Sequence, residues 1–155
     1  MAHRRIATLA VAAIVSYLLL SHFDPQFFLL HLYESAIYMV LLFLLMYEED
    51  EWALAVGMAA PAAWLLLITA TNLSGIFRQV GLVLRFQTPD NPANLMGGVC
   101  MLISALMFGA CLYRWNQERW GFRHAWSTIS AIAVMVGIYY GILVMWYSRL
   151  VMARG

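Results

Sequence analysis

Four side chains that can bind a metal ion or a proton occur close together in the N-terminal part of the chain. They are His22, Asp24, His31 and Glu34. His31 and Glu34 are three residues apart, so on a helix both project from one face. Two imidazoles and two carboxylates can hold a divalent metal ion, and histidines on neighbouring helices can hold a haem. The alternative is that these histidines only hydrogen-bond to water or lipid headgroups.

Glu34 is the only acidic residue that falls well inside an apolar stretch. An ionisable group in such a position is unfavourable unless it is paired or neutral. We expect it to form an ion pair with Arg78 or Arg85, which lie in a later polar segment. The functional alternative is that Glu34 handles protons or cations, as the intramembrane group of a small transporter or channel.

The elements that position these residues are five apolar stretches. They cover residues 6–22, 27–47, 52–71, 93–113 and 125–148. About 20 apolar residues in a helix match the roughly 30 Å hydrocarbon core of a bilayer. The sequence therefore predicts an all-α integral membrane protein. We expect one domain over residues 1–155, built as a bundle of five transmembrane helices, or of four if the short first stretch does not cross.

The composition supports the same class and excludes others. Of 155 residues, 64% are hydrophobic and only 11% are charged, against about 25% charged in soluble domains. A net charge of +1 gives no indication of nucleic-acid binding. The chain has no phosphate-binding glycine loop, Cys-x-x-Cys, His-Glu-x-x-His or nucleophile elbow, so we do not expect an enzyme. The expected partners are the lipid bilayer and other integral membrane proteins.

Between the third and fourth stretches the pattern changes. In residues 74–87 apolar and polar side chains segregate at helical spacing, which predicts an amphipathic helix lying in the membrane interface. Between the second and third stretches stand only four acidic residues, 48–51, so these two helices must form an antiparallel hairpin. Residues 48–51 are interpreted as a solvated turn.

Small residues recur at helical spacing and predict surfaces for close helix packing. The positions are Gly57 and Pro61 in the third stretch, Ala105 and Gly109 in the fourth, and Ala133, Gly137 and Gly141 in the fifth. Pro61 is also expected to kink its helix, because proline frees the carbonyl four residues earlier. A seam beside Pro61 with its flanking alanines can alternatively open a flat pocket for a quinone, a lipid or a pigment.

The arginines near the ends of the stretches predict an orientation. With five helices and the N-terminus inside, five arginines lie inside and four outside. We therefore expect a multi-pass protein of the bacterial inner membrane with a cytoplasmic N-terminus.

Three functions fit these observations. The first is a non-catalytic membrane subunit that packs against and stabilises a larger complex, such as one of energy conversion. The second is a redox or ligand-binding membrane protein that uses His22 and His31 for a haem, a metal or a quinone. The third is a small transporter or channel in which Glu34 is the intramembrane ionisable group.

Overall fold

The computed structural model describes residues 2–47, 50–118 and 122–152. These residues form helices and no strands, which confirms the all-helical class. The elements are α1 (Ala2–Phe23), the short 3-10 helix η1 (Pro25–Phe27), α2 (Phe28–Met46), α3 (Asp50–Leu84), α4 (Pro92–Gln117) and α5 (Phe122–Met152). The five α-helices coincide with the five predicted stretches, and each is long and apolar enough to cross a membrane.

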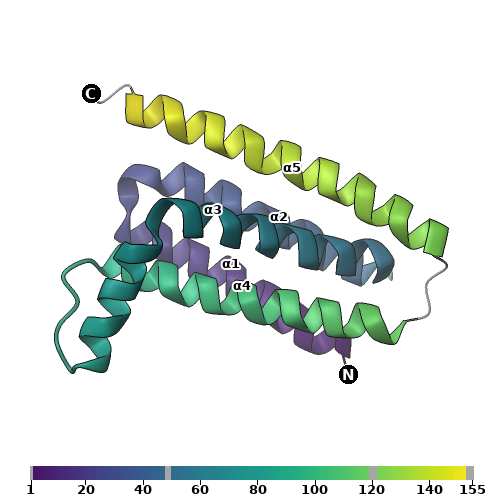
Figure 1. Ribbon diagram of the computed structural model, residues 1–155, viewed down its shortest axis with the longest axis horizontal. Coiled ribbons are helices and arrows are strands. Elements are labelled where there is room, and N and C mark those ends of the chain that lie inside the picture. The colour runs from purple at the N-terminus through teal and green to yellow at the C-terminus, as the bar shows by residue number, and fades with distance from the viewer. Residues whose placement is uncertain (1, 48–49, 119–121, 153–155) are drawn as a thin grey trace.

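The helices form a bundle of three layers (Figure 1). α2 and α3 lie in the middle, α1 and α4 cover one side, and α5 covers the other. Successive helices run in opposite directions, so α1 begins and α5 ends at opposite ends of the bundle. The end at which α5 finishes also holds the turn between α1 and α2.

That turn begins at Asp24. The Asp24 N–H donates to the Leu20 carbonyl at 2.9 Å, and Pro25 then opens η1, where its missing N–H is not needed. The turn places the start of α2 beside the end of α1. At the opposite end of the bundle, α3 begins at Asp50; of the predicted acidic turn, Glu48 and Glu49 lie outside the described residues.

α3 bends at Asn72 rather than at Pro61. Asn72 has non-helical angles, φ −145° and ψ 16°, whereas Pro61 is buried within a continuous helix. The Asn72 side chain donates to Asn94 Oδ1 of α4 at 2.7 Å, so a polar contact holds the bend. Pro61, where a kink was expected, lies within the continuous part of the helix.

After the bend, residues 73–84 continue as a helix that projects from the bundle (Figure 1). This segment corresponds to the predicted amphipathic helix at 74–87, although it is joined to the third long helix and ends at Leu84. Ile76 is buried against α4, where a Cβ on Gly97 or Gly98 would lie 3.4 Å and 3.3 Å from its atoms. The two glycines therefore allow a close approach.

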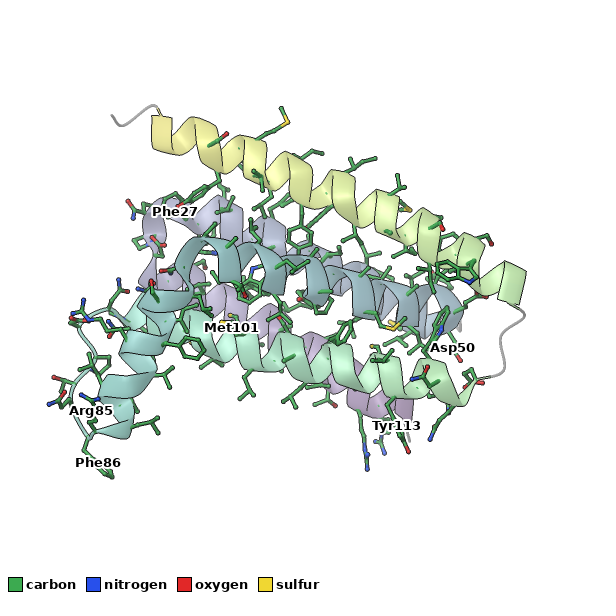
Figure 2. All side chains as sticks on the ribbon, in the orientation of Figure 1. Phe27, Asp50, Arg85, Phe86, Met101 and Tyr113 are labelled. Carbon is green, nitrogen blue, oxygen red and sulfur yellow. The ribbon has the colours of Figure 1, made fainter. Side chains whose placement is uncertain are left out.

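The projecting segment ends in a cap with an unusual residue. The Gln87 N–H donates to the Leu82 carbonyl and the Phe86 N–H to the Val83 carbonyl, both at 2.9 Å, which is a Schellman motif. Phe86 occupies the left-handed position with φ 57°, where glycine is the usual residue. Its side chain is fully exposed and lies at the tip of the segment beside Arg85 (Figure 2).

The core is aromatic at its centre and the outer surface of the bundle is apolar. Tyr17 stacks on Tyr38 at 5.7 Å between ring centroids and meets Trp64 edge-on at 5.6 Å, which joins α1, α2 and α3. Exposed large apolar side chains occur on every long helix, including Leu66 at 73% and Leu102 at 61%. So many exposed large apolar side chains are typical of a surface that contacts lipid or another protein.

Candidate functional site

α2 carries the central pair of the site. Because His31 and Glu34 are three residues apart on one helix, their side chains meet: His31 Nδ1 lies 2.8 Å from Glu34 Oε2. Both side chains are buried, with His31 9% and Glu34 6% exposed. The sequence predicted that these two residues share a face, and the structure places them in a hydrogen bond.

α3 supplies the second partner of Glu34. The Trp64 indole N–H donates to Glu34 Oε1 at 3.1 Å, and Trp64 is itself buried. Glu34 therefore has a hydrogen-bond partner at each carboxyl oxygen. This arrangement fixes the carboxyl group and reduces the free energy of burying it.

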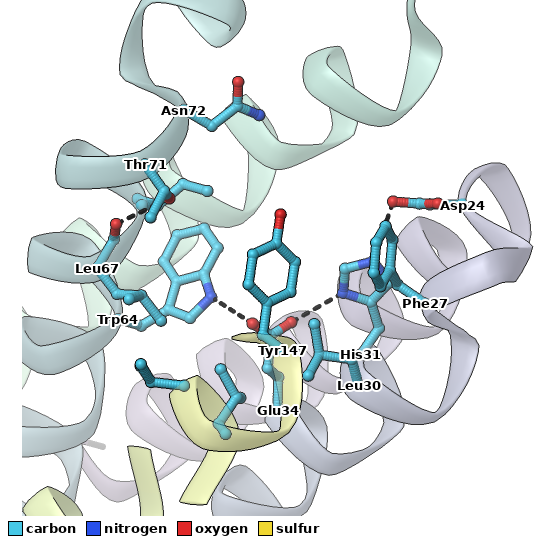
Figure 3. Close-up of a pocket in the computed structure, with 13 residues that line it drawn as sticks. Asp24, Phe27, Leu30, His31, Glu34, Trp64, Leu67, Thr71, Asn72 and Tyr147 are labelled. Carbon is cyan, nitrogen blue, oxygen red and sulfur yellow. Dashed lines mark hydrogen bonds and ion pairs between the residues drawn. The ribbon is translucent and has the colours of Figure 1, made fainter. Parts of the chain in front are cut away.

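The turn before α2 adds a second carboxyl group. Asp24 Oδ2 lies 3.7 Å from His31 Nε2, beyond hydrogen-bond distance, and about a quarter of the Asp24 side chain is exposed. His31 Nε2 is buried and has no hydrogen-bond partner. Asp24, His31 and Glu34 therefore form a row that leads from the end of the bundle into its interior (Figure 3).

This row borders a cavity of about 400 Å³ between α2, α3 and α5. Such a volume lies within the range of small-molecule sites. The cavity combines polar groups with an apolar and aromatic wall (Figure 3). Its lining residues are Asp24, Phe27, Leu30, His31, Glu34, Trp64, Leu67, Ile68, Thr71, Asn72, Leu143, Val144 and Tyr147.

α5 closes one side of the cavity and is held there by aromatic residues. Tyr33 of α2 and Tyr139 of α5 stack at 4.2 Å, and each hydroxyl donates to the backbone carbonyl of the other residue. Phe27 and Tyr147, which both line the cavity, have ring centroids 5.4 Å apart. These contacts join α5 to α2 and to η1 beside the cavity.

The structure does not form the expected ion pair between Glu34 and an arginine. Arg78 instead pairs with Asp90 in the loop before α4, and that carboxylate also accepts from Gln79. Arg85 is exposed at the end of the projecting segment. The pair does not form because Glu34 finds its partners on α2 and α3, while Asp90 lies close to Arg78 along the chain.

The four-residue metal or haem site is not assembled either. His22 is exposed and stacks edge-on against Phe23 at 5.5 Å, so it does not line the cavity with His31. Among the residues that the structure describes, no group of three or more His, Cys, Asp or Glu side chains is placed to hold a metal ion. The reason is geometric: Asp24, His31 and Glu34 lie in a row rather than around one point.

The small residues of α4 and α5 that were predicted to pack closely face outward. Ala105, Gly109, Ala133, Gly137 and Gly141 are all exposed. A Cβ added at any of the three glycines would meet no heavy atom within 4 Å. These positions therefore do not pack against another helix of the same chain.

Gly57 and Pro61 of α3, by contrast, are buried within the bundle. A Cβ at Gly57 would lie 2.5 Å from Cys111 Sγ of α4 and 3.6 Å from Leu41 of α2. Gly57 therefore sits at a close contact between α3 and α4, and Pro61 lies one turn further along the same buried face.

Sequence reasoning missed Trp64 and Tyr147 as site residues. A signal for Trp64 was present, because an indole N–H in the middle of an apolar helix needs an acceptor. Glu34 was the only acidic side chain well inside such a stretch. Tyr147 carried no comparable signal, since tyrosines near helix ends are common in membrane proteins.

Comparison of the chain with protein-family models, with curated proteins and with solved structures finds no match.

Proposed function

We propose that this protein is a multi-pass integral membrane protein that binds a small molecule in the cavity between α2, α3 and α5. The observation that carries the proposal is the buried His31–Glu34 pair on the wall of a 400 Å³ cavity. Buried ionisable groups inside apolar helices are unfavourable, and they usually mark a functional site. In this proposal Glu34 and His31 bind the ligand and are not catalytic.

The composition of the cavity wall supports this proposal. A typical ligand site has a mostly apolar wall and a few polar groups that fix the orientation of the ligand. Here the apolar wall comes from all three helices, whereas the buried charged groups come from α2 alone. The ligand that fits best has an apolar body and one polar end. The proposal retains the ligand-binding hypothesis, with Glu34 in place of His22.

The test is whether a bound molecule depends on the cavity. Ile68 lines the cavity, so Ile68→Trp fills part of it, whereas Leu66→Trp places the same side chain on the exposed face of α3. Each protein is purified in mild detergent, and its bound small molecules are identified by mass spectrometry. We expect a stoichiometric compound in the wild type and in Leu66→Trp that is lost from Ile68→Trp. Equal retention in all three proteins contradicts the proposal.

A second function, a subunit of a larger membrane complex, is favoured by the outward orientation of the small residues. Ala133, Gly137 and Gly141 give α5 an exposed strip with little side-chain bulk. Such strips allow the backbone of another membrane helix to approach closely. We propose that, in this case, the partner packs against α5, with the N-terminus of the chain in the cytoplasm of a bacterium.

Leucine substitutions test this second function without disturbing the bundle. Because a Cβ at Gly137 or Gly141 meets nothing within 4 Å, Gly137→Leu and Gly141→Leu should leave the stability of the isolated chain unchanged. They should release any partner that co-purifies in mild detergent. Val40→Leu, at an exposed position on α2, is the matched control. If both glycine variants keep the same partners as the control, α5 does not dock through this strip.

A further inference from the structure

We infer that the cavity selects a cation that carries N–H groups, namely an ammonium with an apolar body. This inference rests on the proposed ligand-binding function and names the chemical class of the ligand. Three observations carry it: the charge of the lining residues, the hydrogen-bonding capacity of His31, and the aromatic groups in the wall.

Among the side chains that line the cavity, carboxyl groups outnumber basic groups. Asp24 and Glu34 are the two carboxyl groups, His31 is the only side chain that can become positive, and no arginine or lysine lines the cavity. With both carboxyl groups ionised, a protonated His31 offsets only one of the two negative charges. An anionic ligand would therefore be repelled, whereas a cation would complete the charge balance.

The hydrogen-bonding capacity of His31 also favours a ligand that carries N–H groups. His31 Nδ1 and Glu34 Oε2 lie 2.8 Å apart, and when Glu34 is ionised its carboxylate only accepts, so that His31 then donates from Nδ1. In neutral His31 the buried Nε2 is then an acceptor, and it faces another acceptor, Asp24 Oδ2, at 3.7 Å. Two facing acceptors need a donor between them or beside them. An added proton meets this need, and so does the N–H group of a bound ammonium.

The wall provides a further favourable contact for a cation. Phe27, Trp64 and Tyr147 all line the cavity. Cations are attracted to the faces of such rings, most strongly when the site is shielded from water. Glu34 and Trp64 are almost completely buried, which reduces screening of the attraction. The apolar side chains of α3 and α5 would contact the body of the ligand.

The experiment uses three probes that share a phenyl ring and a two-carbon stem: 2-phenylethylammonium, 2-phenylethanol and 3-phenylpropanoate. Their dissociation constants are measured by ligand-observed NMR at neutral pH with the full chain in zwitterionic nanodiscs. Empty nanodiscs give the reference for partitioning into lipid. We expect the ammonium to bind at least tenfold more tightly than the alcohol, and the carboxylate to bind most weakly.

Carboxyl-to-amide variants identify the groups responsible. Glu34→Gln and Asp24→Asn should each weaken ammonium binding at least fivefold and leave alcohol binding within twofold. Glu118→Gln is the matched control, because Glu118 pairs with Arg114 and does not line the cavity. Asp24 is partly exposed in a turn, so Asp24→Asn tests the inference even if Glu34→Gln does not fold.

The outcomes separate this inference from the proposed function. Equal binding of the ammonium and the alcohol overturns the cation preference and leaves the cavity as a binding site. A preference that persists in both Glu34→Gln and Asp24→Asn also overturns it. If none of the probes binds the wild type more tightly than Ile68→Trp, the inference of an ammonium ligand is overturned, whereas the proposed function fails only if the compound that co-purifies is also retained by Ile68→Trp.

Discussion

Glu34 and Trp64 form a hydrogen bond between two helices whose strength depends on the charge of the carboxyl group. Trp64→Phe removes the donor and leaves Glu34 with His31 alone, so we expect the free energy of unfolding to fall by about 1–3 kcal/mol. Urea or SDS titration in mild detergent measures this change. The same substitution in a Glu34→Gln background should cost about 1 kcal/mol less, because hydrogen bonds to neutral groups are weaker.

If Trp64→Phe lowers the free energy of unfolding equally in the wild type and in Glu34→Gln, Trp64 acts only through packing. Trp64 also meets Tyr17 edge-on, so part of the loss in either background comes from this contact. Only the difference between the two backgrounds reports on the hydrogen bond to Glu34.

Gly57 lies at a close contact between α3 and α4. A Cβ there would lie 2.5 Å from Cys111 Sγ, so Gly57→Leu must push the two helices apart. We expect a loss of about 1–3 kcal/mol in the free energy of unfolding, as for other overpacked cores. Gly109→Leu on α4, where a Cβ meets nothing within 4 Å, should change stability by no more than about 0.5 kcal/mol. Comparable losses in the two variants would contradict the assigned helix contact.

Part of the candidate site could be predicted from the sequence, and the missing part has a physical reason. The fixed geometry of a helix places residues three apart on one face, so the His31–Glu34 neighbourhood followed directly from spacing. The partner on another helix depends on how α2 and α3 rotate against each other, and one sequence does not determine that rotation. Charge alone therefore suggested Arg78, whereas packing brought Trp64 to Glu34.

At the scale of the elements, length and hydrophobicity were sufficient to find all five helices, because an apolar stretch of about 20 residues has few alternatives. The change of pattern after residue 72 also located the projecting segment. The bend at Asn72 was not predicted; the sequence indicated a kink only at Pro61, because proline is the commonest cause of a kink. Here the helix continues through Pro61, and the polar contact between Asn72 and Asn94 holds the bend instead.

The cap of the projecting segment gives a prediction at this scale. Phe86 adopts a left-handed conformation that destabilises a non-glycine residue by about 1–2 kcal/mol. Phe86→Gly should therefore stabilise the segment in detergent, seen as slower amide exchange of residues 82–87. In lipid bilayers Phe86→Gly should instead make amide exchange of residues 82–87 faster, because a fully exposed ring at the tip of an amphipathic helix anchors the helix in the interface. Slower exchange in both media would show that the ring does not contact lipid.

For the whole molecule, five crossings require the two ends of the chain to lie on opposite sides of the membrane. α1 begins and α5 ends at opposite ends of the bundle (Figure 1). A reporter fused after Gly155 should face the outside, and one inserted at residues 48–49, between α2 and α3, should face the cytoplasm. The measurement is the activity of a paired reporter that works on one side only. If the C-terminal reporter lies in the cytoplasm and the other reporter outside, the orientation is the inverse of the predicted one. If both reporters lie on one side, five crossings are excluded.

The close contact of Cys111 with the backbone of α3 means that the chain carries its own probe of unfolding. Cys100 and Cys111 are both free and buried, at 1% and 0% exposure. A thiol at either position reacts with a membrane-permeant maleimide only after α4 separates from its neighbours. The rate of alkylation in native lipid therefore follows the opening of the bundle directly, with no cysteine introduced by mutation and no detergent required.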